Sequence, residues 1–328
     1  MLKYVVKRIG ISILILLGVS VILYALLRCM PTDFIESKII ALAANGVEVT
    51  EEFKEALYST YGLDGSIISG YFTWLLNVFK GDFGSSFISQ APVITEIFSA
   101  DKLGVSFMIS AIAVVFEFMI AIPLGVTAAT HQYSIRDYVV TVLVLIGISL
   151  PSFFFGQMLK DIFANKLGWL PVSGMQDLTQ NLTGMARFMD YVKHMILPVM
   201  TVVILSIGGR MRSTRTNMLE VLNSDYIRTA RAKGLKEHKV IYKHAFRNTM
   251  IPIVTGLAGL IPSLFSGAMI TESVFDLSGI GKYALNAMTQ GDIPVIMTYN
   301  MFLATLSVMG VLLADMMYAV VDPRVKLS

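Results

Sequence analysis

The chain has 328 residues, of which 55% are hydrophobic and only 15% are charged, and its formal net charge is +3. Soluble domains carry about a quarter charged residues, so this composition leaves too little polar surface for an ordinary soluble domain.

Six apolar windows follow one another along the chain. Four of them are uncharged over 19 to 24 residues, and each of these matches the roughly 20 apolar residues that cross about 30 Å of hydrocarbon. The second window contains one acid, Glu117, and the fourth is shorter. The windows are Ile9–Leu27, Leu103–Thr130, Tyr138–Leu159, His194–Gly209, Asn248–Thr271 and Ile293–Ala314. The sequence therefore predicts an all-α polytopic membrane protein with six transmembrane helices.

The distribution of charge predicts the orientation of these spans. Basic residues precede the first window, which places the N-terminus in the cytosol, and six spans return the C-terminus to the same side. The segment Arg210–Arg247 holds ten Lys or Arg residues against three acids, and this count places it inside. The 29–102 segment holds ten acids against four basic residues, and it falls outside.

The outer segment has helical patterning. "VTEEFKEALYSTYGL" begins with a Thr50 cap before acidic residues, and "YFTWLLNVFKGDFG" is a second amphipathic stretch. We expect a small helical extracytoplasmic insertion seated on the membrane face, in preference to a disordered loop, because aromatic residues are dense here. The predicted divisions are 1–28 (N-terminus and first span), 29–100 (insertion), 101–321 (transmembrane domain with the cytosolic loop 210–250) and 322–328 (cytosolic tail).

The basic segment contains the stretch "DYIRTARAKG" at 225–234. Such a cluster of cations can bind nucleic acid or anionic lipid, or can simply form a solvated cytosolic face. The local pattern is more specific, because Ser224 or Asp225 can cap a helix that Gly234 ends. Tyr226, Ala230 and Lys233 share the i, i+4, i+7 spacing of one helix face. The pattern favours a short cytosolic helix that docks into a groove on a partner.

A second helix is expected after Gly234, with an apolar stripe formed by Val240, Ile241, Ala245 and Phe246. Pro252 then opens the fifth span. Prolines and glycines recur within the spans, and such breaks are tolerated where the backbone faces protein or a water-filled cavity. They suggest a helical bundle around a path.

The stretch "DYIRTARAKG" resembles the cytoplasmic loop signature of permease subunits of the oligopeptide/dipeptide/nickel branch of ABC importers. Further stretches resemble that family in the same order along most of the chain. Such importers have two permease subunits, and the combination of stretches is similar to the first of them. These stretches are "YGLDG" (61–65), "GDFGSS" (81–86), "IPLGV" (122–126), "SLPSFFFG" (149–156), "LGWLPVSG" (167–174), "RNTMIP" (247–252), "ESVFDLSGIGKYALNA" (272–287) and "DPRV" (322–325).

The broader importer motif is matched only in part. Arg228 and Thr229 stand where that motif has Glu and its first Ala, while Ala230 and Gly234 are kept, as is typical of the peptide branch. The resemblance implies a type I ABC importer permease fold, and it implies that a coupling helix seats in a cleft of an ATPase subunit. The implied coupling residues are Asp225, Tyr226, Arg228, Thr229, Ala230, Arg231, Ala232 and Gly234.

The resemblance also implies the partners and the location. The partners are a second homologous permease, two ABC ATPases, an extracytoplasmic substrate-binding (lipo)protein, a peptide substrate and membrane lipid, with no nucleic acid. The location is the cytoplasmic (inner) membrane of a bacterium or archaeon, with both termini cytosolic.

No phosphate-binding loop of the Walker type is expected. "SGIGKYA" comes nearest, but Asp276 stands where the earlier glycine is required, and the segment is predicted to lie outside. The four histidines are scattered without the spacing of a metal site. We therefore predict no catalytic residue, no metal, no cofactor and no enzyme activity, so that partner subunits hydrolyse ATP.

Glu117 is the one carboxylate deep in a predicted span, where a charge is costly unless it is protonated or paired. It could line the translocation path and meet the amino group of a peptide, or it could be a hydrogen-bonded residue packed against another helix. The packing interpretation is the favoured one.

The leading hypothesis is a permease subunit of an ATP-driven peptide importer. Nickel or another small solute is the alternative cargo within the same branch. A secondary transporter would need several membrane-embedded acids, and the sequence has essentially one. A membrane sensor or scaffold is the remaining class, and neighbouring genes for ATPases, a second permease and a binding protein would exclude it.

Overall fold

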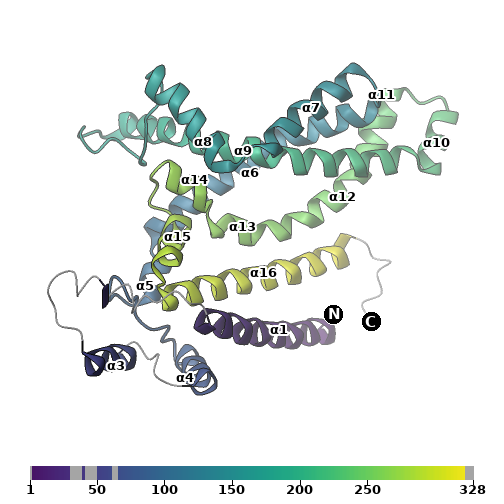
Figure 1. The fold of residues 1–328 in the computed structure, drawn as a ribbon. Coiled ribbons are helices and arrows are strands. Elements are labelled where there is room, and N and C mark those ends of the chain that lie inside the picture. Colours follow the sequence, from purple (N-terminus) through teal and green to yellow (C-terminus); the bar gives the residue numbers. More distant parts are fainter. Residues whose placement is uncertain (1, 30–38, 41–49, 61–65, 322–328) are drawn as a thin grey trace. The chain divides into compact units, whose positions relative to one another are not determined.

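The computed structural model describes residues 2–29, 39–40, 50–60 and 66–321, and within these ranges the chain is helical, with one isolated β-bridge between Ser85 and Pro92. The all-α polytopic fold is thereby confirmed. Figure 1 shows the helices, which are α1 (Leu2–Cys29), α3 (Glu51–Thr60), α4 (Ile67–Phe79), α5 (Val93–Ile97), α6 (Ala100–Thr130), α7 (Ile135–Ser149), α8 (Ser152–Lys160), η1 (Asp161–Lys166), α9 (Gly184–Leu222), α10 (Asp225–Ala232), α11 (Glu237–Lys239), η2 (Val240–Ala245), α12 (Phe246–Gly256), η3 (Leu257–Leu260), α13 (Ile261–Ser266), α14 (Met269–Val274), α15 (Ile280–Gln290) and α16 (Ile293–Val321).

Four helical stretches in the described ranges are long and apolar enough to cross a membrane: Val6–Cys29, Val93–Thr130, Gly184–Leu222 and Ile293–Met316. They contain four of the six predicted windows. The two remaining windows are helical but interrupted.

The window Tyr138–Leu159 is split between α7 and α8, and the helical stretches on either side are bent by 98°. Pro151 explains the break, because a proline disfavours the helical conformation of the residue before it and has no N–H to donate. Leu150 accordingly adopts an extended backbone, with φ −86° and ψ 131°. We expected one span here, and the proline that breaks its helix lies within the predicted window.

The window Asn248–Thr271 is divided among α12, η3, α13 and α14. Gly267 separates the last two with φ 71° and ψ 160°, a backbone conformation that is essentially restricted to glycine. Apolar composition therefore predicted the membrane character of this stretch but not its interruption.

The chain forms two compact units. Unit 1 contains the described residues within 1–103 and 283–309, and unit 2 contains those within 104–282 and 310–326. In unit 1, the predicted helices of the insertion are present as α3 and α4. The loop motif "YGLDG" and the "DPRV" tail lie outside the described residues.

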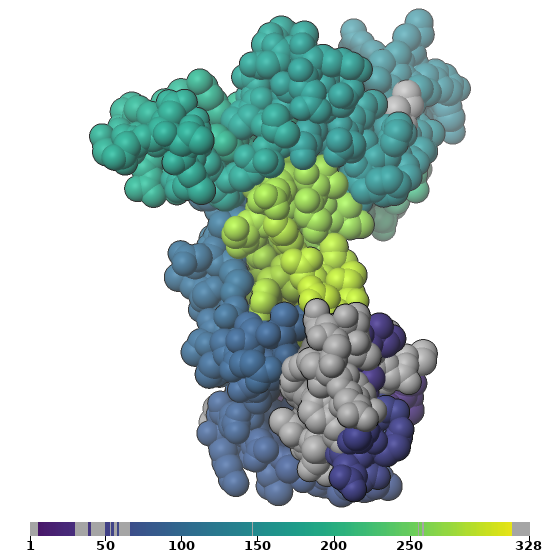
Figure 2. All heavy atoms as spheres, turned by 60° about the vertical axis from the view of Figure 1, so that its left-hand side comes forward, coloured from purple at the N-terminus to yellow at the C-terminus, as the bar shows by residue number. Residues whose placement is uncertain are grey.

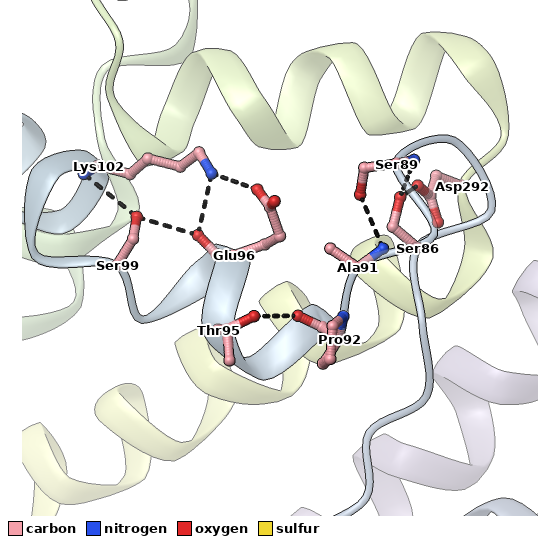
Figure 3. Close-up of polar contacts among 9 residues, drawn as sticks. All are labelled: Ser86, Ser89, Ala91, Pro92, Thr95, Glu96, Ser99, Lys102 and Asp292. Atoms are coloured by element: carbon pink, nitrogen blue, oxygen red, sulfur yellow. Dashed lines mark hydrogen bonds and ion pairs between the residues drawn. The ribbon is translucent and has the colours of Figure 1, made fainter.

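A buried carboxylate organises part of unit 1. Asp292 accepts hydrogen bonds from the Ser86 hydroxyl (2.6 Å) and from the backbone N–H of Phe87 (3.1 Å), so it fixes the "GDFGSS" loop to the start of α16. Figure 3 shows Ser86 and Asp292 facing each other, and it shows Lys102 reaching back to Glu96 to form an ion pair. The Lys102 ammonium also lies 4.4 Å from the centre of the Tyr283 ring.

The core of unit 2 is apolar and joins four helical segments. Ile109 of α6, Phe155 of α8, Leu197 of α9 and Phe275 after α14 are all buried in one cluster. Helices α7 and α9 approach closely at Gly208, where an added Cβ would collide with the Ile148 side chain. This packing holds α9 in place, and the basic loop continues from the end of that helix.

Candidate functional site

The predicted coupling helix is α10, Asp225–Ala232, and Figure 1 shows it beyond the C-terminal end of α9. Ser224 occupies the N-cap position, as expected, but its hydroxyl donates to the Val221 carbonyl (2.6 Å) and does not accept a bond from the helix. At the other end, the N–H of Gly234 donates to the Arg231 carbonyl (2.9 Å), and the N–H of Leu235 donates to the Ala230 carbonyl (3.4 Å).

These two bonds form a Schellman motif, which requires a left-handed residue at the position of Gly234. Gly234 has φ +75°, so the prediction that it ends the helix is confirmed.

One face of α10 is buried against its own chain. Ile227 and Ala230 lie in an apolar cluster with Val126 and Ala129 of α6, Met218 of α9, and Val240 and Ala245 of η2. The apolar stripe predicted for the second helix is therefore present, although it lies mainly on the π-helical η2. The buried face of α10 therefore shares one apolar cluster with residues near the C-terminal ends of α6 and α9.

The other face of α10 is exposed. Ala230 differs from the expected pattern, since it lies with Ile227 on the buried face and not with Tyr226 and Lys233 on the outer one. The i, i+3 spacing of Ile227 and Ala230 places both against the cluster. The predicted coupling residues with exposed side chains or backbone are Asp225, Tyr226, Arg228, Thr229, Arg231, Ala232 and Gly234.

Two ion pairs shape the charge of this surface. Arg231 donates two hydrogen bonds to the carboxylate of Glu237 in α11, from Nε (3.3 Å) and from Nη2 (2.7 Å). This hydrogen bonding lowers the pKa of the Glu237 carboxyl below its ordinary value of 4.5 and raises that of Arg231. Arg228 lies 3.5 Å from Asp225 one turn earlier. The α10 surface therefore combines cations with carboxylates that orient them.

Glu117, the predicted path residue, is buried in α6 and paired with α9. The Nε of Arg210 donates to its carboxylate at 3.0 Å, and the guanidinium also lies 4.5 Å from the centre of the Phe118 ring. A second pair joins α7 to α9, since Arg215 forms two hydrogen bonds of 3.1 and 3.0 Å to the buried Asp137. Two cations of the basic segment thus serve helix packing.

Sequence reasoning also missed the buried carboxylate of Glu272 in α14. Its side chain is fully buried in unit 2 and accepts three hydrogen bonds. One comes from the Ser106 hydroxyl of α6 (2.7 Å), one from the Ala268 N–H (3.1 Å) and one from the Lys282 N–H in the first turn of α15 (2.8 Å). Figure 2 shows the yellow-green surface of this segment beside the blue surface of α6.

Three glycines make room for this carboxylate. An added Cβ at Gly267, Gly279 or Gly281 would collide with the oxygens of Glu272. Two of these glycines belong to "SGIGKYA", the stretch that only distantly resembles a phosphate loop. Its backbone surrounds a carboxylate of the same chain. The signal that could have revealed the site is an acidic residue followed by closely spaced glycines.

Family models match both parts of the chain. Residues 121–327 match the family "Binding-protein-dependent transport system inner membrane component", and residues 1–129 match its N-terminal counterpart. The prediction of a membrane transport subunit, and not an enzyme, is thereby confirmed.

Curated relatives match over nearly the whole length. The oligopeptide transport system permease protein AppB of Bacillus subtilis is 35% identical over 99% of this chain and 100% of its own length. The dipeptide transport system permease protein DppB of Escherichia coli K12 is 33% identical over 99% of both chains. The di/tripeptide permease DppB of Pseudomonas aeruginosa is 32% identical with the same coverage. This chain therefore belongs to the family of inner membrane permease components of binding-protein-dependent transport systems.

Proposed function

We propose that the chain is one permease subunit of an ATP-driven peptide importer. The relatives that match it over their full length are named as peptide permeases, which supports a peptide cargo. The proposed complex contains a second homologous permease, two ABC ATPases and an extracytoplasmic binding protein. The two permeases together would form the path for the peptide.

The observation that carries this proposal is the construction of α10. Its buried face rests on α6 and α9, and its exposed face presents Tyr226, Arg228 and Arg231. A helix seated in this way can transmit the closure of two ATPases to the membrane helices, since the apolar cluster beneath it is close-packed. For Glu117, the ion pair with Arg210 supports the packing interpretation over contact with cargo.

The proposed orientation places α10 and both termini in the cytosol of a bacterial or archaeal cell. The basic excess of Arg210–Arg247 supports it. The proposed divisions remain those predicted from the sequence, with the insertion outside. The same orientation places the connection 160–193, between the third and fourth windows, outside as well.

A matched pair of cysteines tests this orientation in intact cells. In a Cys29→Ser background, a membrane-impermeant thiol reagent should label Leu178→Cys, in the outer connection, and should not label Lys236→Cys, beside α10. Both positions are exposed, so accessibility depends on the side of the membrane alone. Labelling of Lys236→Cys from outside would overturn the orientation and, with it, the coupling role of α10.

Reconstitution with the partner subunits tests the cargo. We expect ATP-dependent uptake of labelled peptide that excess unlabelled peptide suppresses and that excess Ni²⁺ leaves unchanged. Uptake of ⁶³Ni in place of peptide would establish the alternative cargo. The competition compares two cargoes in the same parental complex, whereas variants of α10 test coupling, so the peptide assignment and the coupling assignment are tested by different measurements.

A further inference from the structure

Helix α4 of unit 1 is apolar but too short to cross a membrane. It runs from Ile67 to Phe79 and contains no charged residue. Its 13 residues extend about 20 Å, whereas the hydrocarbon core is about 30 Å thick. The Ser66 hydroxyl caps its start by accepting the Ser69 N–H, and Gly81 follows its end with φ +82°. The helix therefore begins and ends with local stop signals. Its position depends on what surrounds the side chains along its length.

The exposed side of α4 is divided into two stripes. Large apolar side chains recur at the i, i+4, i+8 and i+11 positions and are mostly exposed: Ile68 (72%), Phe72 (57%), Leu76 (60%) and Phe79 (75%). Directly beside them, at about one residue's rotation, Ser69, Thr73 and Asn77 form a polar stripe. A helix surface that changes from apolar to polar around the helix axis, with both stripes running along its length, fits the boundary between acyl chains and headgroups.

The remaining side of α4 packs on the C-terminal part of α1. The Tyr24 ring of α1 lies 5.7 Å from the Tyr71 ring and 6.0 Å from the Trp74 ring, and Ser20 is hydrogen-bonded to the Tyr71 hydroxyl (2.9 Å). Gly70 allows this close approach, because an added Cβ would collide with the Tyr24 hydroxyl. Figure 1 shows α4 lying at a steep angle to α1.

This arrangement specifies a location. Helix α1 is long enough to span the membrane, and Tyr24 lies near its end, in the zone where Tyr and Trp gather at the membrane–water interface. A helix fixed crosswise at that level lies in the plane of the interface. We propose that α4 is an interfacial helix whose Ile68–Phe72–Leu76–Phe79 stripe is immersed in the lipid of the leaflet where α1 ends.

The polar stripe favours lipid over a protein partner as the occupant. The Ser69 and Thr73 hydroxyls donate to backbone carbonyls at the start of the helix (3.1 and 3.0 Å). A protein groove deep enough to cover the apolar stripe would also bring the adjacent Asn77 amide toward a dry surface, where a polar group without a partner is costly. At the interface this amide reaches hydrated headgroups. The proposal does not depend on the identity of the transported molecule.

Spin labelling of the assembled complex tests the proposal. Single cysteines are introduced at Ile68, Phe72 and Leu76 for the apolar stripe and at Ser69 and Thr73 for the polar one, in a Cys29→Ser background. The complex is purified with its co-purifying subunits and reconstituted in liposomes. Ile22→Cys on the exposed side of α1 serves as a reference within the span.

We expect labels on the apolar stripe to collide more with oxygen than with a water-soluble nickel chelate, at depths of about 5–10 Å below the headgroups. Labels on the polar stripe should show the reverse preference. Apolar-stripe labels that are more accessible to the nickel chelate would mean that α4 lies in water. Immobilised labels that are shielded from both reagents would mean that a protein subunit covers the stripe. Either result overturns the proposal.

Discussion

The segments around Gly234 and Gly267 both contain a glycine with positive φ, but the two glycines have different surroundings. Gly234 ends α10 in open space, since an added Cβ would meet no atom within 4 Å. Gly267 is enclosed, and its added Cβ would lie 2.6 Å from the Glu272 carboxylate and 2.7 Å from the backbone N of Gly281. The first glycine serves the shape of an exposed surface, whereas the second serves the packing of a buried polar centre.

The same contrast holds for charge. Around α10, the cations and acids are exposed and paired over short sequence distances, as in Arg231 with Glu237. Around Glu272, a carboxylate is fully buried and accepts hydrogen bonds from a hydroxyl in a distant part of the chain, that of Ser106, and from two backbone N–H groups nearby in the sequence. We therefore expect changes at the buried centre to act on stability, and changes at α10 to act on transport.

The largest expected effect is that of Gly267→Ala. The substitution places a side chain in a conformation essentially restricted to glycine and against a buried carboxylate, so it should destabilise the protein by roughly 3 kcal/mol or more. The measurement is the melting temperature and the yield of monodisperse protein in detergent. Gly259→Ala is the matched control, because Gly259 has open space and no positive φ. Equal melting temperatures for the two variants would refute the enclosed character of Gly267.

Glu272→Gln sharpens the same comparison. The Gln side chain keeps its size but brings an amide NH₂ toward one of the donors that now meet the carboxylate, so a buried donor loses its acceptor at a cost of about 1–3 kcal/mol. Ser106→Ala removes one hydrogen bond and should cost less. Thermal unfolding of both variants provides the ranking. A Glu272→Gln variant as stable as the parent would show that the hydrogen bonds to the Glu272 carboxylate do not stabilise the fold.

The Glu117–Arg210 pair tests whether a carboxylate within a span serves packing or transport. Glu117→Gln leaves Arg210 partly buried without its partner and should cost about 1–3 kcal/mol of stability. Because the two residues are in contact, Glu117→Gln combined with Arg210→Met should cost less than the sum of the single changes. Additive losses, or a loss of uptake at unchanged stability, would favour the path-lining role.

At Gly234, the prediction concerns transport. Gly234→Val strains the left-handed residue at the end of α10 and should lower uptake about tenfold or more while ATP hydrolysis continues, since 1.4 kcal/mol corresponds to a factor of ten. Gly234→Asn is the matched control, because Asn tolerates the left-handed conformation. If Asn fails as well, the site requires close approach of a partner and not only a backbone conformation. Uptake at the parental rate in Gly234→Val would contradict the coupling role.

The smallest effect is expected from the exposed Arg231–Glu237 pair. The folded-state pKa of Glu237 is below its ordinary value of 4.5, so the stabilisation is fully present above that pH and is lost as pH falls through the lowered pKa. Glu237→Gln should therefore narrow the stability difference between pH 7 and pH 4 only slightly, as exposed pairs contribute little. Differential scanning fluorimetry at pH 7 and pH 4 measures this stability difference for the parent and the variant. A large change in the difference on substitution would show that the pair is coupled to a buried group.

The sequence by itself determined the membrane character of the chain, the helices of the insertion and the position at which α10 ends. These features depend on local properties: long uncharged windows, amphipathic stretches, and a Gly where a helix must turn left-handed. The family resemblance also rested on short contiguous stretches, which comparison with known proteins confirmed.

Tertiary structure decided which face of α10 is buried and where the polar centres form. Ala230 was expected on the outer face, but the cluster with Met218 and Val240 takes it inside. Ser106 and Glu272 are 166 positions apart, and no local sequence pattern predicts the hydrogen bond between them. Hydrogen bonds between such distant residues depend on the packing of whole helices, because a buried carboxylate is stable only where folding brings its donors together.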